Sequence, residues 1–181
     1  MNFSEAQQDM RRAYYDGATG LIVSATAWLI AAMVAWQSTP GNAIGALLIG
    51  GVFIFPTSVA LSRLMGRTGV HSKENPLSSL ATTGTLWMLL AIPIAYGASL
   101  YKVDWFFPAM LMTIGGRYLT FTTLYGLRTY YFCGAALSVA GIALVLLKMP
   151  ALVGALVGAS IEYFFACLIF LKAKNASRLA L

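Results

Sequence analysis

The sequence predicts an all-α, polytopic transmembrane bundle of six helices, N-in/C-in, with a short N-terminal amphipathic interfacial helix. Its 181 residues are 59% hydrophobic and only 10% charged, whereas soluble domains carry about 25% charged residues. Its apolar runs continue for about 20 residues, the length of a spanning helix. A membrane strand would instead alternate apolar and polar residues. Lipid also requires every backbone group to be satisfied internally, which helices achieve.

The apolar runs divide the chain into three parts. Residues 1–16 precede the first run, 17–171 form a single transmembrane domain, and 172–181 form a cytoplasmic tail. The connections are short, except for a loop near 63–77. The six predicted spans are about 17–36, 42–62, 78–100, 106–127, 130–148 and 151–171.

Positive charges predict the orientation, because Lys and Arg concentrate in cytoplasmic segments. Only Lys102 and Lys148 fall on the opposite side of the predicted bundle, which places both termini in the cytoplasm and the chain in the plasma or inner membrane. The positive charges that give the net charge of +6 therefore set the orientation of the chain in the membrane. The expected partner is lipid rather than nucleic acid. The residues on the cytoplasmic side are Arg11, Arg12, Arg63, Arg67, Lys73, Arg128, Lys172, Lys174 and Arg178.

The segment before the first span predicts a surface helix over 3–15. Ser4 and Gln7 have the spacing of a capping box. Apolar residues recur at helical spacing while Arg11 and Arg12 lie off that face, so the helix is expected to lie along the inner leaflet. The apolar positions are Phe3, Ala6, Met10 and Tyr14.

Two opposite charges, Arg117 and Glu162, fall near the middle of spans 106–127 and 151–171. At about 1.5 Å per residue, each lies roughly 15 Å from a polar end. A lone charge at that depth costs about 2.5–3.5 kcal/mol on insertion scales. Both spans run in the same direction, which predicts that the two charges meet. Three interpretations stay open: an ion pair that locks the bundle, a polar site that faces a cavity, and two charges that never meet.

The neighbours of these charges define the predicted substrate-binding residues. Helical spacing places two threonines on the face of Arg117. Gly154 and Gly158 precede Glu162 on a span of small residues, which allows close helix contact in lipid. The predicted residues are Arg117, Glu162, Thr113, Thr120 and Tyr118.

Signatures of catalysis and metal binding are missing from the sequence. It contains no nucleophile elbow, no His-Glu-x-x-His and no phosphate-binding loop, so no catalytic residue, metal or cofactor is predicted. Cys133 and Cys167 fall within spans and are expected to be small buried residues. The lone His71 is expected to be a solvated loop residue.

Three segments carry a resemblance to a known family: Trp105 to Arg128, Asp9-Met-Arg-Arg12, and Gly66-Arg-Thr-Gly69. They resemble a bacterial family of six-helix integral-membrane proteins known only as a domain of unknown function. The resemblance implies the fold over nearly the whole chain and implies no activity.

The resulting hypothesis is a small transporter or solute-binding membrane protein with a midplane site at Arg117 and Glu162. One alternative is a membrane-embedded enzyme that uses Glu162 as general acid or base. Another is the substrate-binding subunit of a larger uptake complex. Six helices in about 180 residues resemble the substrate-binding components of vitamin uptake transporters, although their substrate-loop signatures are missing. A small-molecule substrate and a second copy or membrane partner are the expected partners.

Overall fold

The computed structural model describes residues 1–178, with side chains to residue 174. Over these residues the chain is helical and contains no strand, which confirms the predicted fold class. The six long helices are preceded by the short helix α1. The elements are α1 (Phe3–Tyr14), η1 (Tyr15–Gly17), α2 (Ala18–Gln37), α3 (Pro40–Leu64), α4 (Leu77–Tyr101), η2 (Val103–Trp105), α5 (Phe106–Tyr125), α6 (Thr129–Leu146) and α7 (Ala151–Arg178).

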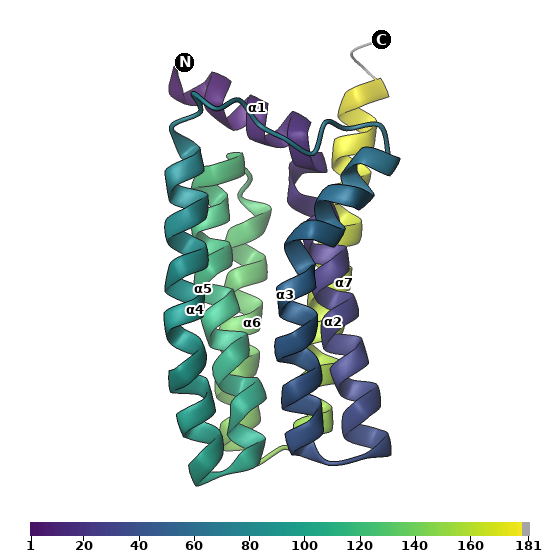
Figure 1. The fold of residues 1–181 in the computed structure, drawn as a ribbon, viewed down its shortest axis with the longest axis vertical. Helices are drawn as coiled ribbons and strands as arrows, with labels where there is room; N and C mark the ends of the chain where they lie inside the picture. The colour runs from purple at the N-terminus through teal and green to yellow at the C-terminus, as the bar shows by residue number, and fades with distance from the viewer. Residues whose placement is uncertain (179–181) are drawn as a thin grey trace.

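The long helices form two three-helix bundles that stand side by side (Figure 1). In one bundle α2 packs along α3 and α7, and in the other α5 packs along α4 and α6. The two bundles join where α7 meets α6 and α5, whereas α3 makes little contact with α4 or α5. The last helix therefore completes the bundle that the first two long helices begin.

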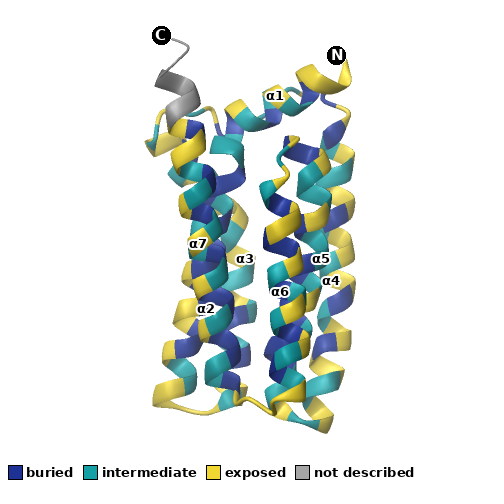
Figure 2. Cartoon of the chain, turned by 180° about the vertical axis from the view of Figure 1, so that it is seen from behind, coloured by how far each residue is buried: buried dark blue, intermediate teal, exposed yellow. Residues whose placement is uncertain are grey.

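Five helical stretches are long and apolar enough to cross a membrane, with Phe3–Gln37 counted as one stretch. Membrane insertion therefore follows from length and composition. The sixth long helix, α5, does not reach that hydropathy because it carries Arg117, two adjacent glycines and several threonines. It packs between α4 and α6, so its polar groups are screened from the surroundings by its neighbours. Figure 2 shows that buried residues line the inward faces of the helices.

The observed helix ends lie close to the predicted ones, except at α7. That helix continues through Arg178, so the segment expected as a tail over 172–181 is helical as far as that residue. The predicted tail beyond Arg178 lies outside the described residues.

The N-cap of helix α1 lies two residues before the predicted one. The N-cap is Asn2, whose side chain accepts a hydrogen bond from the Glu5 N–H at 2.9 Å. The Glu5 carboxylate accepts one from the Asn2 N–H at 2.8 Å. The predicted Ser4–Gln7 box is therefore wrong, because Ser4 already lies inside the helix. Gln7 instead donates to the Thr123 carbonyl of α5 at 2.8 Å.

Helix α1 lies across one end of both bundles, at the end where the N-terminus and the C-terminal end of α7 are found (Figure 1). Its residues Ala6 and Met10 are buried, whereas Phe3 is exposed. The Asp9 carboxylate accepts hydrogen bonds from the Ser72 N–H at 2.9 Å and the Asn75 amide at 2.7 Å. These bonds attach the α3–α4 loop to α1.

The link between α1 and α2 is a sharp turn. Tyr15 and Asp16 have positive φ angles of 53° and 58°, and the Tyr130 hydroxyl donates to the Asp16 carbonyl at 2.7 Å. Burial raises the pKa of the Asp16 carboxyl, while the nearby Arg11 and Arg67 act in the opposite direction. The turn lets α1 run across the end of α2 rather than continue it.

Replacing Asn75 with alanine is expected to destabilise the protein by about 1–3 kcal/mol, because buried partners lose their hydrogen bonds. The side chain is 1% exposed. It donates to the Ala6 carbonyl at 2.9 Å and accepts from the Leu77 N–H at 2.9 Å. Thermal unfolding in detergent measures the loss. The matched control is Asn42→Ala, which removes an exposed bond to Ser38 and is expected to change stability little. Equal stability of the two variants would contradict the prediction.

Candidate functional site

A cavity of about 110 Å³ lies between the two bundles. Its walls come from α2, α3, α4 and α5, so both bundles contribute to it. The lining is mostly apolar, with Met88, Met110 and Ile114 on the α4–α5 side. Ser24 and Trp28 line it from α2. The cavity is partly open to the surroundings.

A larger hollow of about 360 Å³ lies on the outer surface between α2 and α7. It is lined by apolar side chains such as Leu29, Met33 and Leu156. Neither a charged nor a hydroxyl side chain lines it. An apolar hollow on the outer surface suits lipid tails. The smaller cavity between the bundles includes the Ser24 hydroxyl in its lining, so it is the better candidate site.

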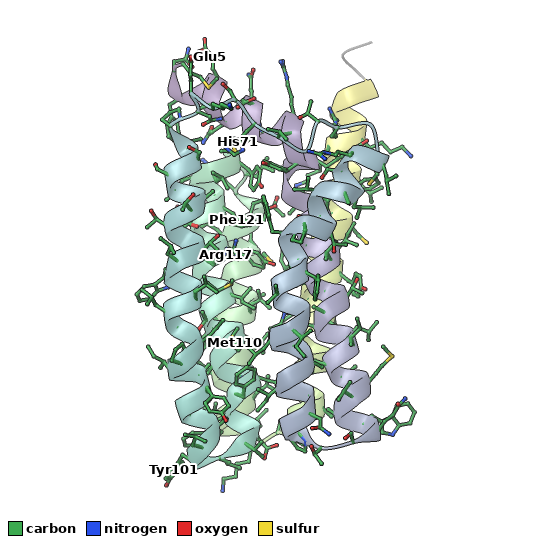
Figure 3. All side chains as sticks on the ribbon, viewed as in Figure 1. Glu5, His71, Tyr101, Met110, Arg117 and Phe121 are labelled. Atoms are coloured by element: carbon green, nitrogen blue, oxygen red, sulfur yellow. The ribbon has the colours of Figure 1, made fainter. Side chains whose placement is uncertain are left out.

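Arg117 projects from α5 at the edge of the cleft between the bundles (Figure 3). Its guanidinium donates to the Met88 sulfur at 3.1 Å and to the Thr85 hydroxyl at 3.1 Å, both on α4. It also lies 5.4 Å from the centre of the Phe121 ring, within cation–π range. Its Nε atom is buried and has no hydrogen-bond partner.

Arg117 and Glu162 form no direct ion pair among the described side chains. The reason is the helix geometry of α5: successive residues point about 100° apart, so Arg117 faces α4 while Tyr118 faces α7. The Tyr118 hydroxyl donates to the Glu162 carboxylate at 2.9 Å. A direct ion pair is therefore not formed, and the residue next to Arg117 contacts Glu162 instead.

Glu162 is fully buried on α7. Besides Tyr118, the side chains of Ser24 and Trp28 on α2 face its carboxyl group. One carboxyl oxygen, Oε2, has no hydrogen-bond partner, and neither has the indole N–H of Trp28. Because Ser24 and Trp28 also line the cavity, Glu162 lies directly behind the cavity wall.

Two glycines of α7, Gly154 and Gly158, make room for aromatic residues of neighbouring helices. A Cβ atom on Gly158 would lie 2.7 Å from the Trp28 ring, and one on Gly154 would lie 2.8 Å from Phe107. Each distance is shorter than a normal carbon contact. The predicted Gly154–Gly158 packing signal thus receives one ring from α2 and one from α5, which brings α7 against both bundles.

A family model matches residues 3–172 of the chain, which is nearly its whole length, and its description is a family of unknown function, DUF7010. The chain belongs to this family. The resemblance expected from the sequence is thereby confirmed, and it assigns no activity. No curated protein and no solved structure matches the chain.

In this member of the family, two of the predicted site residues use their hydroxyl groups locally. Thr113 donates to the Ala109 carbonyl at 2.9 Å, and Thr120 donates to the Arg117 carbonyl at 2.7 Å. Both bonds satisfy backbone acceptors of α5 itself. The roles of Arg117, Glu162, Thr113, Thr120 and Tyr118 in binding substrate stay a prediction.

Sequence reasoning missed four residues that surround the two charges: Thr85, Met88, Ser24 and Trp28. Thr85 and Met88 are three positions apart on α4, a spacing that puts both on one helix face. The spacing alone did not indicate a site, because a single hydroxyl in an apolar span usually donates a hydrogen bond to a carbonyl of its own helix. Thr85 also makes such a bond, to the Ala81 carbonyl. Ser24 carried no signal because a small residue in a span usually serves helix packing.

The two cysteines and the one histidine lie outside the lining of the cavity. Cys133 is buried as expected, whereas Cys167 is exposed on the surface of α7, contrary to expectation. His71 lies in the α3–α4 loop as predicted, but it is half-buried and its Nδ1 atom lies 2.9 Å from the Tyr14 hydroxyl, so it is only partly solvated. Over the described residues, no group of three or more His, Cys, Asp or Glu side chains is placed to hold a metal ion.

Proposed function

We propose that this chain is a small transporter or solute-binding protein of the plasma membrane, with its site in the cleft between the two bundles. The observation that carries the proposal is the position of Arg117: its guanidinium donates to Met88, a residue in the wall of a cavity that both bundles line. Charged groups within membrane spans are costly and usually mark substrate or ion pathways. Binding sites of membrane transporters commonly lie near the midplane between two helical units.

The geometry favours binding over catalysis. Glu162 is fully buried behind Ser24 and Trp28, so a substrate in the cavity would not touch it in this arrangement. Arg117 is half-buried and lies on the cavity side of α5. The group that a solute meets is therefore a hydrogen-bond donor rather than an acid or base.

The proposal includes an orientation with both termini in the cytoplasm of a bacterial cell. Its support is the excess of Lys and Arg in the segments at that end, including α1 and the α3–α4 loop. The expected result is that a cysteine at position 73 in a background without Cys133 and Cys167 resists a membrane-impermeant maleimide in intact cells. It should react after the cells are opened. Labelling in intact cells would reverse the orientation. A cysteine at position 102, at the opposite end, is the matched control and should react in intact cells.

Filling the cavity tests the site. Gly51 lines the cavity, and a Cβ atom there would have no neighbour within 4 Å. Gly51→Phe therefore places a ring in the open space without a clash at the backbone. Gly45 on the same helix also has an open Cβ position but does not line the cavity, so Gly45→Phe is the matched control.

Small molecules that co-purify with the three proteins from membranes are extracted and compared by mass spectrometry. We expect a solute that accompanies the wild type and Gly45→Phe and falls about tenfold in Gly51→Phe, a loss of about 1.4 kcal/mol of binding free energy. Identical extracts from all three folded proteins would reject the cleft as the binding site.

A further inference from the structure

The N–H donors of the Arg117 guanidinium have weak acceptors or none. Its partners are a thioether, a hydroxyl and the face of an aromatic ring, and its buried Nε has no partner. In the part of the chain with described side chains, no carboxylate lies within 4.0 Å of it. A guanidinium presents five N–H donors in a planar fork that suits a carboxylate. Arg117 therefore retains capacity for an anion.

The position of Arg117 on α5 directs it to the cavity. Met110, Ile114, Arg117 and Phe121 follow one another at intervals of four, three and four residues, which places them on one helix face. The first two line the cavity. Met88, which also lines the cavity, accepts a hydrogen bond from Arg117. Arg117 thus stands at one end of the cavity wall, and Figure 3 shows it and Met110 along the same edge.

The remainder of the cavity wall suits an apolar body. Leu47, Val52, Leu89 and Ile92 line it from α3 and α4. The cavity is partly open to the surroundings, and α3 makes little contact with α4, so we infer an opening between these two helices. The volume of about 110 Å³ holds only part of a long ligand, so the rest would extend between α3 and α4.

We propose that the cleft binds a single-chain amphiphile with a carboxylate head, which pairs with Arg117 while its apolar body occupies the cavity. This inference rests on the proposed function and adds the class of solute. A monoanion matches the charge of one guanidinium. The Thr85 hydroxyl beside it accepts from Arg117 and donates to the Ala81 carbonyl, so it adds no second donor for a larger charge. An amine is disfavoured because Glu162, the carboxylate at this depth, is sealed behind Trp28 and Tyr118.

The test uses the full chain in nanodiscs of phosphatidylcholine and a fluorescent fatty acid as the reporter. A saturated fatty acid, the alcohol of equal chain length and the corresponding amine compete with it, and empty nanodiscs provide the background. In the wild type and Gly45→Phe we expect the acid to displace the reporter at a concentration about tenfold below that of the alcohol, because a hydrogen bond to a charged group is stronger than one between neutral groups. The amine should compete no better than the alcohol.

Arg117→Met should remove the advantage of the acid and leave displacement by the alcohol unchanged, whereas Arg117→Lys should keep part of that advantage. Thermal unfolding checks that each variant is folded. If Arg117→Met does not fold, the comparison of acid and alcohol on the wild type decides the matter alone.

The outcomes separate the two proposals. Equal competition by acid and alcohol, or stronger competition by the amine, overturns the carboxylate inference and leaves the cleft as a site. Reporter binding no greater than in empty nanodiscs also overturns the inference, while the extraction experiment still decides the proposed function. Displacement that Gly51→Phe does not alter overturns the cleft as the site, and both proposals with it.

Discussion

Replacing Gly134 with alanine is expected to destabilise the protein by about 1–3 kcal/mol or more, because the new methyl group would overpack the contact between α5 and α6. A Cβ atom there would lie 2.6 Å from the Gly115 carbonyl oxygen. A Cβ atom built on Gly115 would in turn lie 2.7 Å from the Gly134 carbonyl oxygen. Both obstacles are backbone atoms, so the helices must separate to admit a side chain. Small residues allow such close crossings in lipid, where packing drives helix association.

Gly116→Ala is the matched control for this prediction. Gly116 is next to the crossing, but a Cβ atom there would have no neighbour within 4 Å. Alanine is the better helix former by about 1 kcal/mol, so this variant should be as stable as the wild type or more stable. Unfolding in increasing detergent or heat, followed by tryptophan fluorescence, measures both. A Gly134→Ala protein as stable as Gly116→Ala would show that the two helices are not in close contact.

Tyr118→Phe is expected to have the second largest effect, a destabilisation of about 1–3 kcal/mol, because a buried acceptor loses its donor. The Tyr118 hydroxyl gives Glu162 its one geometrically well-formed hydrogen bond among the described contacts. Glu162 is 0% exposed, so water does not replace that donor. Adding Glu162→Gln to the variant should recover part of the loss, because the amide carries no charge.

The control for Tyr118 is Tyr163→Phe on α7. The Tyr163 hydroxyl lies 2.8 Å from that of Thr26 in an exposed position, so its removal should cost little. Equilibrium unfolding of the purified variants in one detergent gives the comparison. If Tyr118→Phe and Tyr163→Phe unfold alike, the carboxyl group of Glu162 does not depend on Tyr118.

The candidate site was only partly predictable from the sequence. Arg117 and Glu162 stand out because each is a charge within an apolar run, and that signal needs no neighbours. Their partners carry no such signal: Thr85 and Ser24 are ordinary small polar residues, and Trp28 is an ordinary aromatic. Equal depth could not predict whether the two charges form a direct ion pair, because depth does not determine the rotation of a helix. A rotation of α5 by one residue decides whether Arg117 or Tyr118 faces α7.

The sequence by itself determined that the chain is helical, that it has six long apolar helices and where most of them begin and end, because these depend on local hydropathy and length. Only the tertiary structure decided that α7 joins α2 and α3, which divides the six long helices into two bundles with a cavity between them. It also decided that Arg117 turns to α4 while Tyr118 reaches Glu162. These features depend on contacts between residues far apart in the chain, such as Gly158 with Trp28 and Gly134 with Gly115. Shape complementarity between helix surfaces selects those contacts, and hydrophobic pattern alone does not encode it.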